Sequence, residues 1–241
     1  CGYDRYPNTI SIWNKLNKIP LPIRRTIAGI LPFHYLSDGL TASTPDELYF
    51  YLNTQWKGYP GLINGLSFKN KERIQMEKIL KDPMERFMYY DINKYLPDDI
   101  LVKVDRAAMA TSLETRVPLL DQDLIEYAWS LPMSIKYNNN ITKWPLKQLL
   151  YKYVPQSLLD RPKMGFGVPV AEWLRGPLKE WANELLSMER IEADGFFDSK
   201  IIQNHWQQHI SGKKNRSYGL WAIIMFQAWH EKNKLIDKNL F

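Results

Sequence analysis

Two stretches of the sequence carry residue types that can do chemistry at a ligand. The first, residues 101–121, places six charged side chains in an otherwise apolar segment. They are Lys103, Asp105, Arg106, Glu114, Arg116 and Asp121. An unpaired charge in apolar surroundings costs several kcal/mol, so these side chains must be paired or solvated. Two interpretations stay open: a structural ion-pair network that locks a helix against its neighbours, which the pattern favours, and a polar site floor that faces a phosphate or carboxylate.

The second stretch, residues 160–169, is a predicted loop punctuated by proline and glycine. Pro162 restricts the residue before it to an extended conformation, and Gly165, with a second glycine two residues later, lets the backbone approach a ligand closely. Lys163 is then held on a constrained loop, where its ammonium group suits a phosphate oxygen. An ordinary exposed lysine is the alternative.

A third candidate, Lys143, follows Thr142 at the start of a predicted helix. Helix N-termini favour anions, so a phosphate could bind there with Lys143 assisting. The positive charge of Lys143 gains nothing from the helix dipole at the N-terminus. We therefore expect this side chain to interact with some other group. Simple solvent exposure of the lysine is the alternative.

The pair His205 and His209 has the i, i+4 spacing of a helical zinc site. No glutamate follows His205 and no third ligand is evident, so we expect a solvated helix face and no metal site. The basic cluster Lys213, Lys214 and Arg216 is expected to be a solvated connection between two helices.

Helices are the elements that must position these residues, because apolar residues recur at helical spacing and period-2 alternation is nearly absent. The clearest start is the run from Thr44 to Glu47, a capping box. Residues 132–140 and 160–169 are predicted loops, and residues 20–40 show no clear element. Further helices are predicted from Pro83 to Pro97, after Asp105 through Ala110, from Asp121 to Pro132, over Thr142–Tyr153, within Pro177–Ser187, over Asp198–Ile210 and over Ser217–Lys234.

Length and composition set the outer bounds. The 241 residues allow one large or two small domains, and 45% hydrophobic with 13% aromatic residues exclude intrinsic disorder. One cysteine excludes an intrachain disulfide. The net charge of +6 suits a protein that handles phosphates more than one that coats nucleic acid. The longest apolar stretch, residues 218–229, is too short to span a bilayer, and no signal peptide is expected.

Two motifs, in this order, resemble the synthetase region of glutamine-dependent asparagine synthases. They are "LVKVDRAAMATSLETRVPLLD" and "RPKMGFGVP", with "TKWPLK" between them. The resemblance extends over most of the chain and is strongest from Asp98 to Pro169. It implies that residues 1–241 form the mostly helical C-terminal part of an α/β synthetase domain of the adenine-nucleotide α-hydrolase type.

The resemblance also implies a reaction. ATP adenylates the side-chain carboxylate of aspartate and releases pyrophosphate, and ammonia drawn from glutamine then displaces AMP to give asparagine. The Ser-Gly-Gly-x-Asp-Ser loop and the acidic pyrophosphate loop, which hold ATP and Mg²⁺ in this family, have no counterpart in this sequence. The isolated chain is therefore expected to be inactive. Cys1-Gly2 matches the stretch that follows the pyrophosphate loop, rather than the nucleophile of the family's glutaminase domain.

Matching the motifs residue by residue assigns expected roles. Lys163 is expected to contact phosphate and stabilise charge at adenylation, and Asp105 to orient the reacting groups. Lys143 is expected near pyrophosphate. Substrate or phosphate binding is further expected of Lys103, Arg106 and Gly165, and a structural or supporting role of Glu114, Arg116 and Asp121. No residue of this chain is expected to hold a metal.

Two other functions stay open on the sequence. A family member could amidate another carboxylate, such as a sugar acid of a surface polysaccharide. A non-catalytic helical module, in which the charges only build an ion-pair lattice, is the rival from another class. Under the leading interpretation the partners are small molecules and the rest of the polypeptide, without nucleic acid or membrane. A homodimer stays open, and the location is expected to be the cytoplasm.

Overall fold

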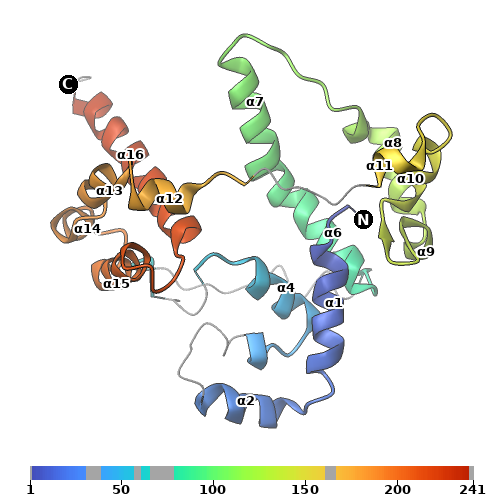
Figure 1. Cartoon of the computed structure of the whole chain (residues 1–241), viewed down its shortest axis with the longest axis horizontal. Helices are drawn as coiled ribbons and strands as arrows, with labels where there is room; N and C mark the ends of the chain where they lie inside the picture. Colours follow the sequence, from blue (N-terminus) through green and yellow to red (C-terminus); the bar gives the residue numbers. More distant parts are fainter. Residues whose placement is uncertain (1, 31–38, 57–60, 66–78, 161–166, 239–241) are drawn as a thin grey trace. The chain divides into compact units, whose positions relative to one another are not determined.

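The computed structural model describes residues 2–30, 39–56, 61–65, 79–160 and 167–238 (Figure 1). The chain divides into two compact units. Unit 1 comprises Cys1–Asn53 and Asn70–Lys163, and unit 2 comprises Thr54–Lys69 and Met164–Phe241. The predicted mostly helical fold is confirmed. In the described ranges, strands are confined to one antiparallel pair in unit 1, β1 (Tyr137–Asn138) and β2 (Ile141–Thr142).

The helices of unit 1 occur in two runs, separated by a segment that belongs to unit 2. The first run is α1 (Arg5–Leu16), α2 (Leu21–Ile30) and α4 (Pro45–Asn53). The second run is α6 (Pro83–Asn93), the π-helical turn η1 (Leu96–Leu101), α7 (Val102–Met109), the 3₁₀ turn η2 (Pro118–Leu120), α8 (Gln122–Ser130), α9 (Met133–Lys136), α10 (Trp144–Leu150) and α11 (Gln156–Leu159).

The predicted capping box at α4 is confirmed with a shift of one residue. The backbone N–H of Glu47 donates to the Thr44 hydroxyl at 3.2 Å, and the Glu47 carboxylate reaches back to the N–H of Ser43 at 2.6 Å. The predicted start at Pro83 is also confirmed, because Asp82 caps α6 by accepting from the N–H of Met84 at 2.7 Å. Local polar groups therefore fix both helix starts.

The predicted helix end at Pro97 is wrong. Helix α6 stops at Asn93, and Pro97 lies in the first turn of η1, where its missing N–H has no intrahelical partner to lose. The chain then continues into α7, which begins at Val102 and already contains Asp105. The predicted loop over residues 132–140 is also wrong, since α9 and β1 lie within it.

Helix α2 occupies part of the stretch that the sequence left unassigned. Arg24 is buried at 3% exposure and holds this region by side-chain bonds to backbone oxygens. Its Nε donates to the carbonyl of Ile19 at 3.0 Å, and one terminal nitrogen donates to the carbonyls of Leu40 and Ala42 at 3.0 and 2.9 Å. These hydrogen bonds join segments that are far apart in the sequence, so the spacing of residues within one helix could not predict them.

The core of unit 1 is aromatic. Tyr49 of α4 stacks on Phe87 of α6, with ring centroids 4.3 Å apart and planes 8° from parallel. Tyr6 of α1 lies beside both rings, and Met84 and Met88 complete the cluster. Stacking at this separation stabilises beyond simple burial, so three helices are joined at one aromatic contact.

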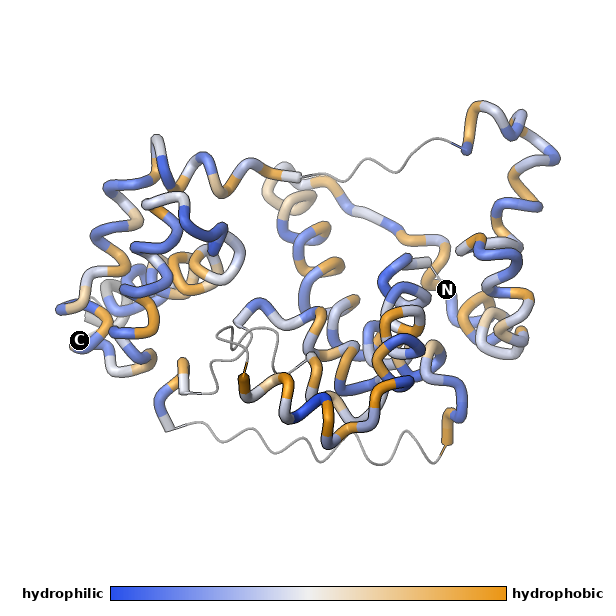
Figure 2. The backbone as a smooth tube through the Cα atoms, turned by 60° about the horizontal axis from the view of Figure 1, so that its bottom comes forward, coloured by the Kyte–Doolittle hydropathy of each residue, from blue (hydrophilic) through white to orange (hydrophobic). Residues whose placement is uncertain are grey.

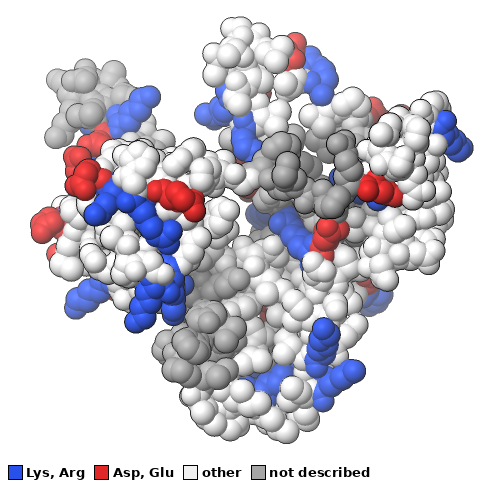
Figure 3. Space-filling model, in the orientation of Figure 1, with Lys and Arg blue, Asp and Glu red and all other residues white. Residues whose placement is uncertain are grey.

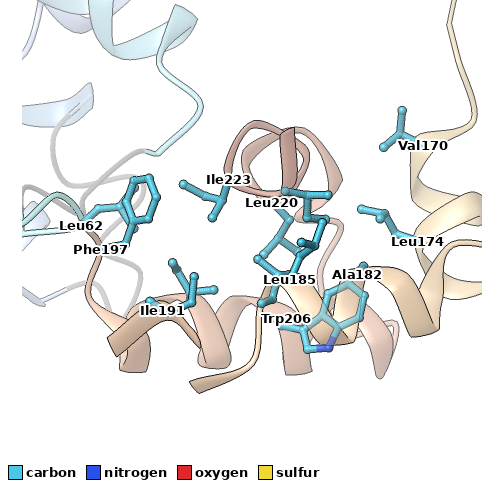
Figure 4. Close-up of a cluster of buried hydrophobic side chains, with 13 residues drawn as sticks. Leu62, Val170, Leu174, Ala182, Leu185, Ile191, Phe197, Trp206, Leu220 and Ile223 are labelled. Carbon is cyan, nitrogen blue, oxygen red and sulfur yellow. The ribbon is translucent and has the colours of Figure 1, made fainter. Parts of the chain in front are cut away.

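Unit 2 packs five helices around an aliphatic core (Figure 4). These are α12 (Val170–Arg175), α13 (Lys179–Leu185), α14 (Met188–Asp194), α15 (Ser199–Ile210) and α16 (Ser217–Lys238). Leu174, Ile202 and Leu220 are fully buried there. The segment 61–65 joins this core through an isolated antiparallel β-bridge between the backbones of Ile63 and Phe197. Figure 2 shows hydrophobic positions interspersed with hydrophilic ones along these helices, as expected for helices that bury one face.

Candidate functional site

Lys143 stands at the helix start, as predicted. It is the N-cap residue of α10 and adopts the left-handed conformation, with φ 58° and ψ 31°. This conformation is rare for lysine and costs energy, so the surrounding structure must impose it. The Lys143 side chain lies along the backbone of Gly2: a Cβ atom on Gly2 would be 3.0 Å from Cε and 4.0 Å from Nζ. A side chain at position 2 would require the flexible end of Lys143 to shift by a few tenths of an ångström.

Gly2 and Lys143 border a pocket of about 380 Å³ within unit 1. Apart from two lysines and Tyr127, its lining consists of apolar residues and Gly2. The apolar side chains come from α6, η1, η2, α8 and α10 and from the residue after α8; they are Met88, Ile92, Leu96, Leu119, Leu120, Leu124, Ile125, Ala128, Trp129, Leu131, Pro145 and Leu146. No carboxylate contributes to this lining.

The second lysine of the pocket, Lys136, is already engaged. Its Nζ lies 3.8 Å from the carboxylate of Glu85 and donates to the carbonyl of Trp129 at 3.3 Å. It also lies 5.1 Å from the centre of the Trp129 ring. Burial lowers the pKa of Lys136, and Glu85 opposes that effect. Lys136 is thus a buried structural cation.

The charges of the 101–121 motif are exposed. Lys103, Asp105 and Arg106 lie on α7, which has no buried residue, and Figure 3 shows positive and negative side chains together on this surface. Lys103 is 66% exposed, with its Nζ 3.8 Å from the carboxylate of Asp99 one turn earlier. Glu114 and Arg116 form a second exposed pair at 2.5 Å.

Among the described residues, the interpretation of this motif as an ion-pair network that locks a helix against its neighbours is therefore wrong. The two pairs are local in sequence and are solvated. Asp121 has a different place: its carboxylate accepts from the N–H of Leu124 at 3.2 Å and caps α8, as the helix prediction required. Lys163 and Gly165 lie outside the described residues.

A buried polar cluster that the sequence did not single out lies at Asp91 on α6. Its carboxylate accepts from the hydroxyls of Tyr6 at 2.5 Å and Tyr49 at 2.7 Å, and pairs with the guanidinium of Arg5. Burial, together with the hydrogen bond to Asp91, raises the pKa of both tyrosines. The sequence did contain a signal for this cluster: Asp91 lies three residues after Met88, on the apolar face of the predicted helix.

The Arg5 guanidinium is also held between two aromatic rings. It lies 4.5 Å from the ring centres of Tyr3 and Tyr95. This arrangement combines cation–π attraction with the ion pair to Asp91. The segment that follows Gly2 is thereby anchored to α6 and to Tyr95, which precedes η1.

The prediction that His205 and His209 form a solvated face is wrong, because both rings are buried. His205 stacks on Trp56 with centroids 4.6 Å apart. His209 accepts from the N–H of Arg216 at Nδ1, 3.2 Å away, and its Nε2 faces the carbonyl of Ala171 at 3.3 Å. Burial lowers the pKa of His205 to about 4, helped by Arg216, and also lowers that of His209. The pair therefore serves the core of unit 2.

Two further findings concern metal ions and membranes. No group of three or more His, Cys, Asp or Glu side chains among them could hold a metal ion. No helix within the described ranges is long and apolar enough to cross a membrane.

Comparison with known sequences places this helical chain in a family. A sequence model of the asparagine synthase family matches residues 1–231. The chain belongs to the asparagine synthase family. No solved structure matches it.

Individual relatives agree with this assignment. A putative glutamine-hydrolysing asparagine synthetase of Mycobacterium tuberculosis is 38% identical over 150 residues, which cover 62% of this chain and 23% of the relative. Asparagine synthetase 1 of Bacillus subtilis is 31% identical over the same shares. Amidase chry2 of Gibberella zeae is 29% identical over 153 residues, covering 60% and 22%. The chain thus spans about a quarter of the length of the curated relatives it matches.

Proposed function

We propose that this chain is the C-terminal helical part of an ATP-dependent, glutamine-using amide ligase. The observation that carries the proposal is the family match over residues 1–231, which includes Lys143, Lys163 and the whole 101–121 motif. The relatives named as glutamine-hydrolysing asparagine synthetases support the same class. Aspartate is the first acceptor to consider, and another carboxylate is the second.

The proposed reaction has two steps. An oxygen of the acceptor carboxylate attacks the α-phosphorus of ATP, and the bond from that phosphorus to pyrophosphate breaks. The nitrogen of ammonia then attacks the acyl carbon, AMP leaves with the bonding electron pair, and the nitrogen gives up a proton. In this proposal Lys163 stabilises phosphate charge in the first step, and Asp105 orients the reacting groups.

Lys143 suits a supporting role at the phosphates. Its backbone takes the left-handed conformation at the N-cap of α10, and its aliphatic chain passes close to Gly2. An ammonium group at this helix start suits a phosphate oxygen as a point charge. The described residues offer no metal cluster, so no step on this chain is assigned to Mg²⁺.

The surface of unit 1 supports the proposal that the ATP-binding part of the ligase packs against it. Apolar side chains are exposed in succession along α7, the following segment, η2 and α10. They are Val102, Val104, Met109, Leu113, Val117, Leu119, Leu146, Leu149 and Leu150. Apolar side chains exposed in such number mark a place where another polypeptide surface binds. The exposed motif charges would then be covered together with it, which argues against a free-standing helical module.

The test uses the parent polypeptide that carries this chain, supplied with glutamine, ATP and aspartate or a sugar acid. Lys163→Ala should reduce amide formation and pyrophosphate release by about 1,000-fold, because a positioned cation at the transferring phosphate is lost. Glutamine hydrolysis should change little and serves as the internal control. Lys152→Ala, which removes another lysine of unit 1, is the matched control. Normal synthesis rates in Lys163→Ala would overturn the assignment.

A further inference from the structure

The carboxylate of Asp160 binds three side chains at once. It accepts from Nζ of Lys147 at 2.8 Å, from the hydroxyl of Tyr151 at 3.0 Å and from the side-chain nitrogen of Gln156 at 2.7 Å. We call these four residues the Asp160 cluster. Asp160 follows the last residue of α11, and Lys163 comes three positions later in the sequence.

We propose that Asp160 is a positioning residue for Lys163 in the ligase. The Asp160 cluster fixes the point at which the chain leaves α11 towards Lys163, and it ties that point to α10. The inference rests on the proposed function, because it takes Lys163 to be the group that stabilises phosphate charge during adenylation.

Helix α10 provides one side of the Asp160 cluster and also begins at Lys143. The N–H of Lys147 donates to the carbonyl of Lys143 at 3.0 Å, and the N–H of Tyr151 donates to the carbonyl of Lys147 at 2.9 Å. Residues four apart lie one above the other on a helix, so Lys147 and Tyr151 reach Asp160 from one face of α10. The helix that starts at one lysine proposed for the phosphates thus holds the chain that leads to the other.

Asp160 is held by its backbone as well as by its side chain. Its N–H donates to the carbonyl of Gln156 at 2.9 Å, and the Gln156 side chain returns to the Asp160 carboxylate. Contacts at both places fix the direction of the chain at Asp160, and not only its position. A chain of three residues spans at most about 11 Å, so a shift at Asp160 is passed on to a lysine three positions later.

The charge of the Asp160 cluster favours orientation over stability as its purpose. The hydrogen bond from Lys147, with those from Gln156 and Tyr151, lowers the pKa of Asp160 to about 2, so the carboxylate stays ionised at neutral pH. The side chains of Lys147 and Asp160 are 35% and 34% exposed. An ion pair this close to solvent adds little to the stability of a fold, but several donors on one carboxylate restrict its orientation.

The test uses the parent polypeptide, supplied with glutamine, ATP and aspartate or a sugar acid, and follows pyrophosphate release. Asp160→Ala should lower kcat about 30-fold, because a misplacement of about 1 Å in a catalytic group can cost on the order of 100-fold. The KM for ATP should change by less than about twofold, since the weakened interaction is one made in the transition state. Glutamine hydrolysis should stay unchanged and shows that the variant is folded.

Two further single variants bracket this result. Asp123→Ala is the matched control: it removes another exposed acid of unit 1, in the first turn of α8, and should leave kcat unchanged. Asp160→Asn keeps an acceptor oxygen for Tyr151 or Gln156 but loses the ion pair with Lys147. Its kcat should lie between those of Asp160→Ala and the unaltered protein, and it replaces Asp160→Ala should that variant fail to fold.

A double variant tests whether Asp160 acts through Lys163. If it does, Asp160→Ala has nothing left to misplace once the Lys163 side chain is gone. The double variant should then release pyrophosphate at the rate of Lys163→Ala, within about twofold. A structural role elsewhere in unit 1 would multiply the two losses instead, because the effects of independent sites add in free energy.

Each outcome decides the proposal. An Asp160→Ala kcat equal to that of Asp123→Ala, a double variant far slower than Lys163→Ala, or an equal loss of glutamine hydrolysis would overturn it. Failure of the proposed function is distinguishable. Normal synthesis rates in Lys163→Ala remove the role of Lys163 in the ligase, whereas a large loss in Lys163→Ala with none in Asp160→Ala removes the positioning role alone.

Discussion

Unit 1 and unit 2 bury their side chains in different ways. In unit 2 the fully buried side chains are mostly aliphatic and come from all five helices, α12 to α16. In unit 1 the described core is a small aromatic cluster around the carboxylate of Asp91. Unit 1 also exposes a run of apolar side chains along α7, η2 and α10 that its described residues leave in contact with solvent.

This difference between the two cores indicates which interactions stabilise each unit. A closed aliphatic core supplies most of the free energy that a small helical bundle needs, so unit 2 carries its own stability. Unit 1 depends on a buried polar network and leaves apolar surface for another polypeptide part. This pattern fits a unit that works at an interface, which is what the proposed ligase requires of it.

The largest effect that would sharpen this comparison is expected at Asp91. Asp91→Ala leaves the Arg5 guanidinium and the hydroxyls of Tyr6 and Tyr49 without their common acceptor. The free energy of unfolding of unit 1 should fall by about 4 kcal/mol. Hydrogen exchange read separately for each unit in mild denaturant measures this, and unit 2 should keep its protection.

A matched control exists for this variant. Asp105→Ala removes an exposed acid on α7 and should change the stability of unit 1 by less than about 0.5 kcal/mol. Equal losses in Asp91→Ala and Asp105→Ala would mean that the buried network does not hold unit 1 together.

A somewhat smaller effect is expected from the core of unit 2. Leu174 is fully buried, so Leu174→Ala leaves a cavity and should lower the free energy of unfolding by about 3 kcal/mol. The loss should appear in unit 2 and not in unit 1. Met225→Ala, at a partly exposed position on α16, is the control and should cost much less. A loss shared by both units would show that they unfold together.

Acid should weaken unit 2 selectively. The pKa of His205 is lowered from 6.5 to about 4, so between these values the unfolded chain binds a proton that the folded chain does not. Stability is therefore full above about pH 6.5 and falls towards pH 4, by roughly 2 kcal/mol from this residue. Denaturant titrations of unit 2 at pH 7 and pH 4.5 measure the change.

The control for acid sensitivity is His205→Gln, which removes the titrating group at the same position. Its stability should fall less between pH 7 and pH 4.5, although His209 still contributes in the same direction because its pKa is lowered as well. An unchanged pH dependence in His205→Gln would assign the acid effect elsewhere.

The smallest effect is expected in the exposed motif of unit 1. Glu114→Gln breaks the pair with Arg116, but both side chains are more than 70% exposed, so the free energy of unfolding should change by less than about 0.5 kcal/mol. A thermal melt of the chain measures this. A loss well above that value would restore the idea of a stabilising ion-pair network, which the described geometry contradicts.

Local signals in the sequence predicted much of the secondary structure. Thr44, Asp82 and Asp121 occupy helix starts, and two of the three are N-caps that the sequence named, because capping depends on a side chain and backbone N–H groups within one turn. The spacing of apolar and proline residues was less informative in two places. At Pro97 the chain continues as a π-helical turn, and over residues 132–140 a short helix and a short strand form. Such short elements depend on distant packing more than on spacing.

The candidate site was predicted in part. Lys143 was named and its helix-start position is confirmed, but neither its left-handed conformation nor its contact with Gly2 could be inferred, because 141 positions separate the two residues. The roles assigned to Lys163 and Gly165 stay predictions, since both lie outside the described residues. The histidine pair was misjudged because helical spacing alone does not tell which face of α15 turns to the core.

The sequence by itself determined the family, the mostly helical character and the residue types available for chemistry, since motifs and helix periodicity are properties of neighbouring positions. Only the tertiary structure decided which charges are buried. It placed Asp91 in the core of unit 1, left the 101–121 motif in solvent, and brought Gly2 beside Lys143 at an apolar pocket. The physical reason is that burial and pairing depend on contacts between distant segments, and these contacts set both the energy of a charge and the shape of a site.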